Sequence, residues 1–251
     1  MLFLLCAAVL FQDPAPADLK AASDKFGKVK SCAYTLVRSD GSRKETVHVE
    51  AVFADGALHV RMEDVEVIRA AGGTLAKVGE SGWIGIAQAK ERLKTPETDR
   101  SGLLLVLASV PFPQALNVRF FGVVESVSGK GSTFEGKIAG TAANALQDEA
   151  WFMLGDDRRI SSPTGSGKAF LDSNGGLAGL ELSIAGKLLP QPGNGQRPPR
   201  QPPQGPPQNP RGTRRYDTPD VAFTLSIKFD KLNEAKLSLP DDVLKRLGIA
   251  R

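Results

Sequence analysis

Apolar and polar residues alternate without a break near the C-terminus, between Val221 and Asp230. A period of two places all the apolar side chains on one face of a β-strand. They are Val221, Phe223, Leu225, Ile227 and Phe229. After Pro240 two Asp residues are followed, a turn later, by Lys245 and Arg246, a charge order that predicts a short terminal helix. This part of the chain therefore predicts one strand with an apolar face, followed by a closing helix.

Several other short runs are rich in β-branched and aromatic residues and are bounded by Asp-Gly, Gly-Gly or Ser-Gly pairs, which predicts strands. Asp55-Gly56 is the clearest hairpin turn, because this pair accepts the positive φ of a tight connection. Connections without room for a helix predict an antiparallel sheet. The predicted strands are 34–38, 46–54, 57–63, 65–70, 75–78, 83–86, 118–127, 133–139, 168–172 and 177–185.

Three further segments have the pattern of helices. Residues 18–29 carry apolar positions at helical spacing behind Asp18, a predicted N-cap, and residues 142–154 do so behind Thr141. Residues 102–110 follow Ser101 and are apolar on every side, which predicts a helix buried on the sheet or covering its concave opening. The side chains assigned to this lid helix are Leu104, Val106, Leu107 and Val110.

These elements predict an α+β fold, with a strongly curved antiparallel sheet, an incomplete β-barrel, whose concave face is packed or covered by helices. The apolar side chains of that face are candidates for lining a ligand site. They are Val47, Val49, Phe53, Leu58, Val60, Met62, Phe134, Ile138, Phe223, Leu225, Ile227 and Phe229. A half-barrel filled by its own side chains shows the same period, so a structural or interaction module without a ligand is the alternative.

The first residues, Met1 to Phe11, are an apolar run, and Ala15-Pro16-Ala17 has the form of a cleavage site. We predict a signal peptide at residues 1–17, export to the periplasm or cell envelope, and a single domain at residues 18–251. Because neither Lys nor Arg precedes the run, an N-terminal strand or buried segment is the alternative reading. Cleavage would leave Cys32 as the only cysteine, which excludes a disulfide in the mature monomer.

A Pro-rich insertion at residues 187–219 separates the last two predicted strands. Proline at this density supports neither a ladder nor a helix, which predicts a disordered loop. Five Arg and no acidic residue lie between 190 and 215, so the net charge of +4 becomes −1 without them. We interpret the Arg residues as a tether to an anionic membrane or wall surface, with a solvated spacer as the alternative. They are Arg197, Arg200, Arg211, Arg214 and Arg215.

The candidate catalytic and metal motifs fail on inspection. The run Gly165 to Lys168 lacks the remaining positions of a phosphate-binding loop and leads into a strand-like sequence. His48 and His59 lie on the polar sides of predicted strands, and no Gly-x-Ser-x-Gly motif is present. The charges at residues 156–159 indicate a solvated turn. We therefore expect no enzymatic activity, no metal or other cofactor, and no nucleic-acid partner.

The order of elements resembles that of the LolA-type periplasmic lipoprotein carriers and the related LppX-type lipid carriers. The resemblance covers residues 18–247 apart from the Pro-rich loop, and it is strongest from Phe223 to Pro240, where alternating apolar residues lead to Phe-x-x-Leu-Asn-Glu and then Leu-Pro. It implies non-enzymatic binding of a lipid or an acylated protein in the apolar concavity. Arg38 and Arg61 are candidates for the family's ligand-gating basic residue. The Pro/Arg insertion departs from the family.

Overall fold

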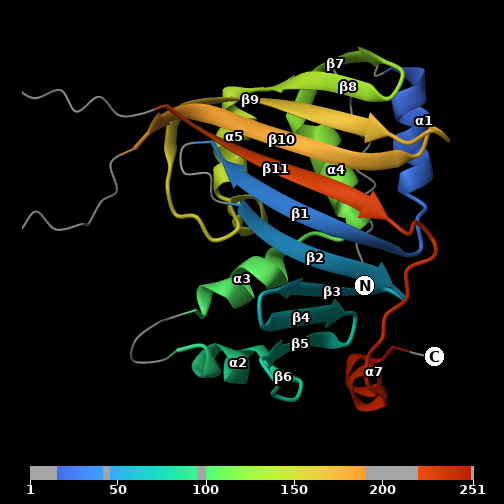
Figure 1. The fold of residues 1–251 in the computed structure, drawn as a ribbon, viewed down its shortest axis with the longest axis vertical. Coiled ribbons are helices and arrows are strands. Elements are labelled where there is room, and N and C mark those ends of the chain that lie inside the picture. Colours follow the sequence, from blue (N-terminus) through green and yellow to red (C-terminus); the bar gives the residue numbers. More distant parts are fainter. Residues whose placement is uncertain (1–15, 42–45, 95–99, 190–219, 250–251) are drawn as a thin grey trace, which may run out of the picture.

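The computed structural model describes residues 16–41, 46–94, 100–189 and 220–249. The strands are β1 (Cys32–Asp40), β2 (Thr46–Ala54), β3 (Ala57–Met62), β4 (Val65–Ala70), β5 (Gly73–Val78), β6 (Ile84–Gly85), β7 (Val124–Lys130), β8 (Thr133–Ile138), β9 (Ile160–Leu171), β10 (Leu177–Leu188) and β11 (Asp220–Asp230). They form one sheet in the order β6-β5-β4-β3-β2-β1-β11-β10-β9-β8-β7 (Figure 1). Every pair is antiparallel, and the sheet is not closed into a barrel.

Seven helices lie within the described residues: α1 (Ala17–Phe26), α2 (Ile86–Arg92), α3 (Gly102–Ser109), α4 (Pro113–Val123), α5 (Gly140–Gln147), α6 (Ala150–Met153) and α7 (Asp241–Leu247). The first six contribute buried side chains to one core on what we call the inner face of the sheet. Helix α7 packs on the outer face of β3, β4 and β5, against Ala57, Ile68 and Leu75 (Figure 1). The predicted α+β class, with an open curved antiparallel sheet, is confirmed.

The alternation in β11 is the clearest link between sequence and fold. Phe223, Leu225 and Ile227 are buried on the inner face, and the residues between them are half-buried or exposed. Strand β1 pairs with β11 so that Tyr34 lies opposite Phe229 and Leu36 lies opposite Ile227. Cross-strand pairs share a face, so the first and last strands in the chain, β1 and β11, contribute to one apolar layer at the centre of the sheet.

The prediction of a strand at residues 118–127 is wrong over its first half, because α4 occupies Pro113–Val123. Pro113 is the first helical residue, where a missing N–H costs nothing. The buried residues then follow helical rather than strand spacing, through Leu116 and Phe120, whereas Val118 between them is exposed. Strand β7 begins only at Val124.

Helix α4 approaches the inner face where the strands carry glycine. A Cβ on Gly167 would lie 2.3 Å from a Val124 methyl carbon and 3.0 Å from a ring carbon of Phe120. Contacts under 3.0 Å are not tolerated without a shift of the surroundings, so glycine is required here by packing. The run Gly165 to Lys168 is the middle of β9, as its strand-like surroundings indicate.

Several element boundaries differ from those predicted. Ser101 is the N-cap of α3, as predicted, although it makes no side-chain capping bond. Asp18 and Thr141 instead lie within the first turns of α1 and α5, whose N-caps are Pro16 and Ala139. The helix predicted at residues 142–154 is two helices, α5 and α6. Residues 83–86 hold the two-residue β6 and the start of α2. Strand β10 continues to Leu188, two residues into the predicted insertion. Residues 190–219 of that insertion, and all but the last two residues of the predicted signal peptide, lie outside the described residues.

Candidate functional site

The apolar side chains predicted to line a ligand site all belong to the inner-face core. Ten of the twelve are buried, and Val47 and Met62 are partly buried. They contact side chains on or next to the protein's own helices. The ring centres of Phe229 and Phe26, on α1, are 4.4 Å apart, and those of Phe53 and Phe112, the N-cap of α4, are 5.8 Å apart. The sheet centre is thus packed by side chains of this chain. Whether these residues also contact a ligand stays a prediction.

The lid helix forms where it was predicted, as α3. Leu104, Val106, Leu107 and Val110, the residues assigned to it, are all buried. The helix packs on the sheet against β3 and β4, but Leu105 is 68% exposed, so α3 is not buried on every side. Because Leu105 is exposed, one side of this apolar helix faces solvent.

Hydrogen bonds from β1 and β4 hold the C-terminal end of α3 on the inner face of the sheet. The Tyr34 hydroxyl donates a hydrogen bond to the carbonyl oxygen of Pro111 at 2.6 Å. Arg69 donates to the carbonyl oxygen of Val110, and its guanidinium lies 5.1 Å from the ring centre of Phe112. These carbonyls follow the last turn of the helix, where backbone acceptors need outside donors.

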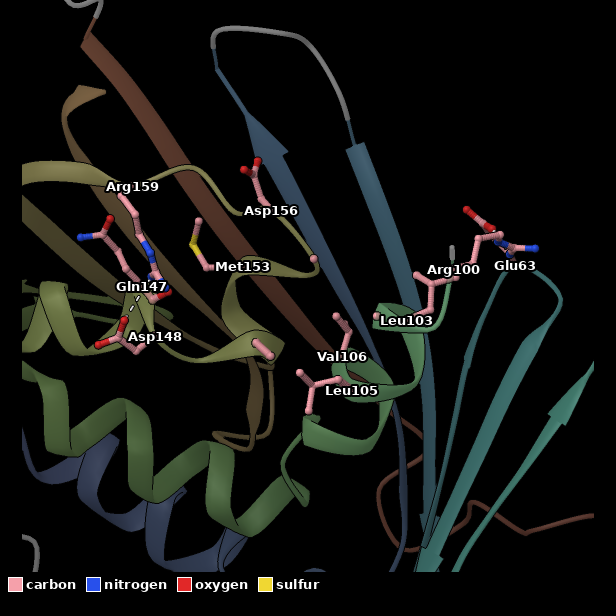
Figure 2. A pocket seen from close by; sticks show the side chains of 13 residues that line it. Glu63, Arg100, Leu103, Leu105, Val106, Gln147, Asp148, Met153, Asp156 and Arg159 are labelled. Carbon is pink, nitrogen blue, oxygen red and sulfur yellow. Dashed lines mark hydrogen bonds and ion pairs between the residues drawn. The ribbon is translucent and has the colours of Figure 1, made fainter. Parts of the chain in front are cut away.

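A cleft of about 580 Å³ opens between α3 and the α5–α6 pair (Figure 2). This volume is in the range of about 300–1,000 Å³ that is usual for small-molecule sites. Its walls are formed by side chains and backbone of α3, α5, α6 and the segments beside them. The lining residues are Glu63, Arg100, Gly102, Leu103, Leu105, Val106, Gln147, Asp148, Ala150, Met153, Gly155, Asp156 and Arg159.

The cleft has an apolar middle and a charged group at each end, as Figure 2 shows. Leu105, Val106 and Met153 lie between the ends. At one end Arg159 forms an ion pair with Asp148, whose Oδ1 is 3.2 Å from Nη1. At the other, Arg100 donates to Glu63 at 2.6 Å and to Asp64 at 2.7 Å.

Asp156, which also lines the cleft, belongs to a buried ionic cluster of Arg38, Asp40, Asp156 and Arg158. Arg38 Nη1 donates to Asp156 at 2.6 Å, and Arg158 Nη2 donates at 2.5 Å to both Asp40 and Asp156. Both guanidiniums lie over the ring of Phe223, at 5.6 Å and 5.0 Å from its centre. Two positive and two negative charges make this cluster neutral.

The prediction of a solvated turn at residues 156–159 is therefore wrong for Asp156 and Arg158, whose side chains are only 7% and 5% exposed. Burial raises the pKa of Asp156, but hydrogen bonds from Arg158 and Arg38 outweigh burial and hold the pKa well below its usual range. The carboxylate consequently stays charged. The cluster fixes the segment after α6 to β1, beneath the cleft.

The two candidate gating residues lie in different places. Arg38 is in the buried ionic cluster, on the inner face. Arg61 is exposed and pairs with Glu50 at 2.5 Å. The five Arg residues of the predicted tether lie outside the described residues.

The two histidines also differ. His48 is exposed, as its position on the polar side of β2 predicts. His59 is only 21% exposed, because Trp83 stacks edge-on against it and its Nε2 lies 2.8 Å from Glu66, which also accepts from Lys77 at 3.0 Å. The interpretation of His59 as a solvated strand residue is therefore wrong.

Two further searches concern the described ranges only. There, no three His, Cys, Asp or Glu side chains gather as they would around a metal ion. No single helix in those ranges has the length and apolar composition to cross a membrane, whereas α3 and α4 pass that test together and are bent by 84° at their break.

The sequence matches no model of a known protein family, and it matches no curated protein. Among solved structures, the chain is similar to a DUF1329 family protein from Desulfovibrio piger. The two share 11% sequence identity and a TM-score of 0.25, over 95% of this chain and 100% of that chain. A TM-score this low says nothing about what this chain binds, so its function has to be argued from the cleft.

Proposed function

We propose that this protein binds the acyl chain of a lipid or a lipidated partner in the cleft between α3 and the α5–α6 pair, without catalysing a reaction. The observation that carries the proposal is the solvent-facing side of α3, where Leu105 is 68% exposed beside a cleft with an apolar middle. Small-molecule sites are typically concave and lined mostly by apolar side chains with a few polar groups, as this cleft is. The resemblance to the LolA-type carriers supports the same function.

Transfer of an acyl chain from water contributes about 0.8 kcal/mol per buried methylene, or roughly 10 kcal/mol for a chain of ~16 carbons. Association and the ordering of the chain oppose a substantial part of this gain. We therefore expect dissociation constants in the micromolar range. The cleft borders the inner-face core through Val106 and Met153, so a longer chain would be accommodated only by displacement of α3 or α6.

The alternative is a structural or interaction module of the cell envelope without a ligand. Its supporting observation is that the sheet centre is packed by the protein's own helices, as the contact between Phe26 and Phe229 illustrates. Under this alternative, Leu105 and the cleft would form part of a protein contact. The two functions differ in whether purified protein carries or takes up lipid.

Native mass spectrometry and organic extraction of protein purified without detergent test the proposal. We expect bound lipid, and uptake of a fluorescent fatty acid by protein from which lipid has been removed. Leu105→Gln should weaken uptake roughly fivefold, because apolar contact is lost, and Ala150→Trp should block it by filling the cleft. Val118→Gln is the control, since Val118 is 46% exposed on α4 but does not line the cleft. Protein that neither carries lipid nor takes up the fatty acid would favour the structural module.

We also propose that the protein is exported and that its Pro/Arg insertion tethers it to an anionic surface. N-terminal sequencing of protein from its native cells should begin at or near Asp18; an intact Met1 in a cytosolic fraction contradicts export.

Lys187 pairs with Asp220 at the base of the insertion, so residues 190–215 can be replaced by a short Gly-Asn turn without altering the hairpin register. This deletion should abolish salt-sensitive binding to anionic vesicles. If vesicle binding persists after the deletion, the alternative holds, in which the insertion is only a solvated spacer.

A further inference from the structure

The two ends of the cleft differ in how completely their arginines are neutralised. Arg100 is held by two carboxylates, Glu63 at 2.6 Å and Asp64 at 2.7 Å. Within the part of the chain that the structure describes, Arg159 forms an ion pair with one carboxylate, Asp148, at the longer distance of 3.2 Å. Any anion that approaches Arg100 therefore meets an excess of negative charge, whereas the Arg159 end is locally balanced.

The ion pair between Arg159 and Asp148 is also more exposed to solvent than the pairs made by Arg100, which weakens it further. Arg159 is 47% exposed and Asp148 is 78% exposed, so water screens their attraction. Exposed pairs of this kind typically contribute no more than about 1 kcal/mol. The buried ionic cluster next to Arg159 does not supply a competing charge, because its two arginines and two aspartates cancel. A ligand carboxylate can therefore displace Asp148 at little cost.

The guanidinium of Arg159 has donors to offer beyond those that it uses within the described residues. Its contacts with the carbonyl oxygen of Gln147 and with Asp148 both go through Nη1. A guanidinium carries five N–H donors in a planar fork that matches the two oxygens of a carboxylate. The edge formed by Nε and Nη2 is suited to such a bidentate contact.

From these observations we infer that the ligand is an anionic single-chain lipid, whose carboxylate binds Arg159 and whose chain lies along Met153, Val106 and Leu105. This inference rests on the proposed function and specifies its ligand. Figure 2 shows the order of these groups along the cleft, with Arg159 and Asp148 at one end and the side chains of α3 leading away from them. Arg159 is then the residue that discriminates a fatty acid from an uncharged lipid of the same length.

The test compares dodecanoate with dodecanol, which share the chain and differ in the head group, both below the concentrations at which they aggregate. Wild-type protein should bind dodecanoate about tenfold more tightly. Arg159→Gln should reduce dodecanoate binding to the level of dodecanol and leave dodecanol binding unchanged. Asp148→Asn should strengthen dodecanoate binding, since it removes the competing carboxylate. Arg119→Gln is the matched control and should change neither affinity, since Arg119 also pairs with one carboxylate, Glu149, at the protein surface but does not line the cleft.

The outcomes separate the inference from the function on which it rests. If the wild type binds neither compound, the proposed function fails and the inference fails with it. If both compounds bind with equal affinity, or if Arg159→Gln weakens both equally, acyl binding stands and the assignment of Arg159 is overturned. Thermal melting of each variant checks folding, and the opposite directions expected for Arg159→Gln and Asp148→Asn cannot both result from a loss of structure.

Discussion

Arg158 donates a hydrogen bond to Asp40 at 2.5 Å, although the two residues are 118 positions apart in the chain. The side chain of Asp40 is fully buried and that of Arg158 is 5% exposed. Arg158 also bonds Asp156, which in turn accepts from Arg38. The buried ionic cluster thus joins the segment after α6 to β1 through charges that water does not reach.

Replacement of Arg158 by methionine should be strongly destabilising. The variant would leave Asp40 without this donor and Asp156 with one arginine fewer, and removal of one partner of a buried pair typically costs about 3–5 kcal/mol. Urea unfolding measures the change in the free energy of unfolding. The neighbouring Arg159→Met is the control and should change stability by no more than about 0.5 kcal/mol, because that side chain is half-exposed. Equal and small losses in both variants would show that the cluster does not stabilise the fold.

His59 should make the protein less stable in mild acid. Burial lowers its pKa below the usual 6.5, and the hydrogen bond to Glu66 offsets only part of this effect. The unfolded chain therefore takes up a proton on His59 before the folded protein does, so stability falls as the pH drops below about 6.5, until the lowered pKa of the folded state is reached. Lys77 and Arg61 add to the unfavourable environment of a charged imidazole.

The window between pH 7 and pH 5 isolates this effect from that of Glu66. Burial raises the pKa of Glu66, but hydrogen bonds from Lys77 and His59 outweigh burial, so its pKa lies below 4.5 and its contribution is lost only in stronger acid. Chemical unfolding at several pH values should show a smaller loss for His59→Gln than for the wild type. His48→Gln alters an exposed histidine and should follow the wild type; an unchanged slope for His59→Gln would contradict the prediction.

Gly167→Ala should destabilise the protein by about 1–3 kcal/mol, because the added methyl group overlaps Val124 and Phe120 beneath α4. Gly122→Ala provides a control of the opposite sign. Gly122 is on the exposed side of α4, and a Cβ there meets no atom within 4 Å. Alanine in a helix is favoured over glycine by roughly 0.5–1 kcal/mol, so this variant should melt at a higher temperature than the wild type. Loss of stability in both would show that α4 tolerates neither change.

Cys32 should be inert in the folded protein. Burial raises the pKa of its thiol to about 12, so almost no reactive thiolate is present at neutral pH. Iodoacetamide at pH 8 should label it only when the protein is unfolded in guanidinium. Peptide mapping by mass spectrometry distinguishes Cys32 from Cys6 if the N-terminal segment is retained. Rapid labelling of the folded protein would mean that β1 opens easily at its start.

The alternation of apolar residues was sufficient to predict most strands, because burial of one sheet face imposes a period of two. The same signal failed at α4, where Phe120-Phe121-Gly122-Val123-Val124 is apolar enough for a buried strand as well as for a helix. Only the helical spacing from Pro113 onwards distinguishes the two, and it is visible in the positions that the structure buries.

The buried ionic cluster was missed for a different reason. Its partners are brought together by folding across more than a hundred residues, and sequence spacing does not report such pairs. One signal was nevertheless present. Arg38 and Asp40 continue the period of two set by Tyr34 and Leu36, which places both charges on the inner face. Charged residues in phase with an apolar alternation therefore indicate buried partners elsewhere in the chain.

The pairing of β1 with β11 also constrains the order in which the protein can form. Strands β1 to β6 can pair with sequence neighbours as soon as they leave the ribosome, and β7 to β11 can do the same later. The two halves are joined by the pairing of β1 with β11, in which Leu36 lies opposite Ile227, and β11 ends only at Asp230. Until β11 is synthesised, the edge of β1 that pairs with it has no partner. A chain arrested before residue 220 would therefore present this unpaired edge to chaperones or to other chains.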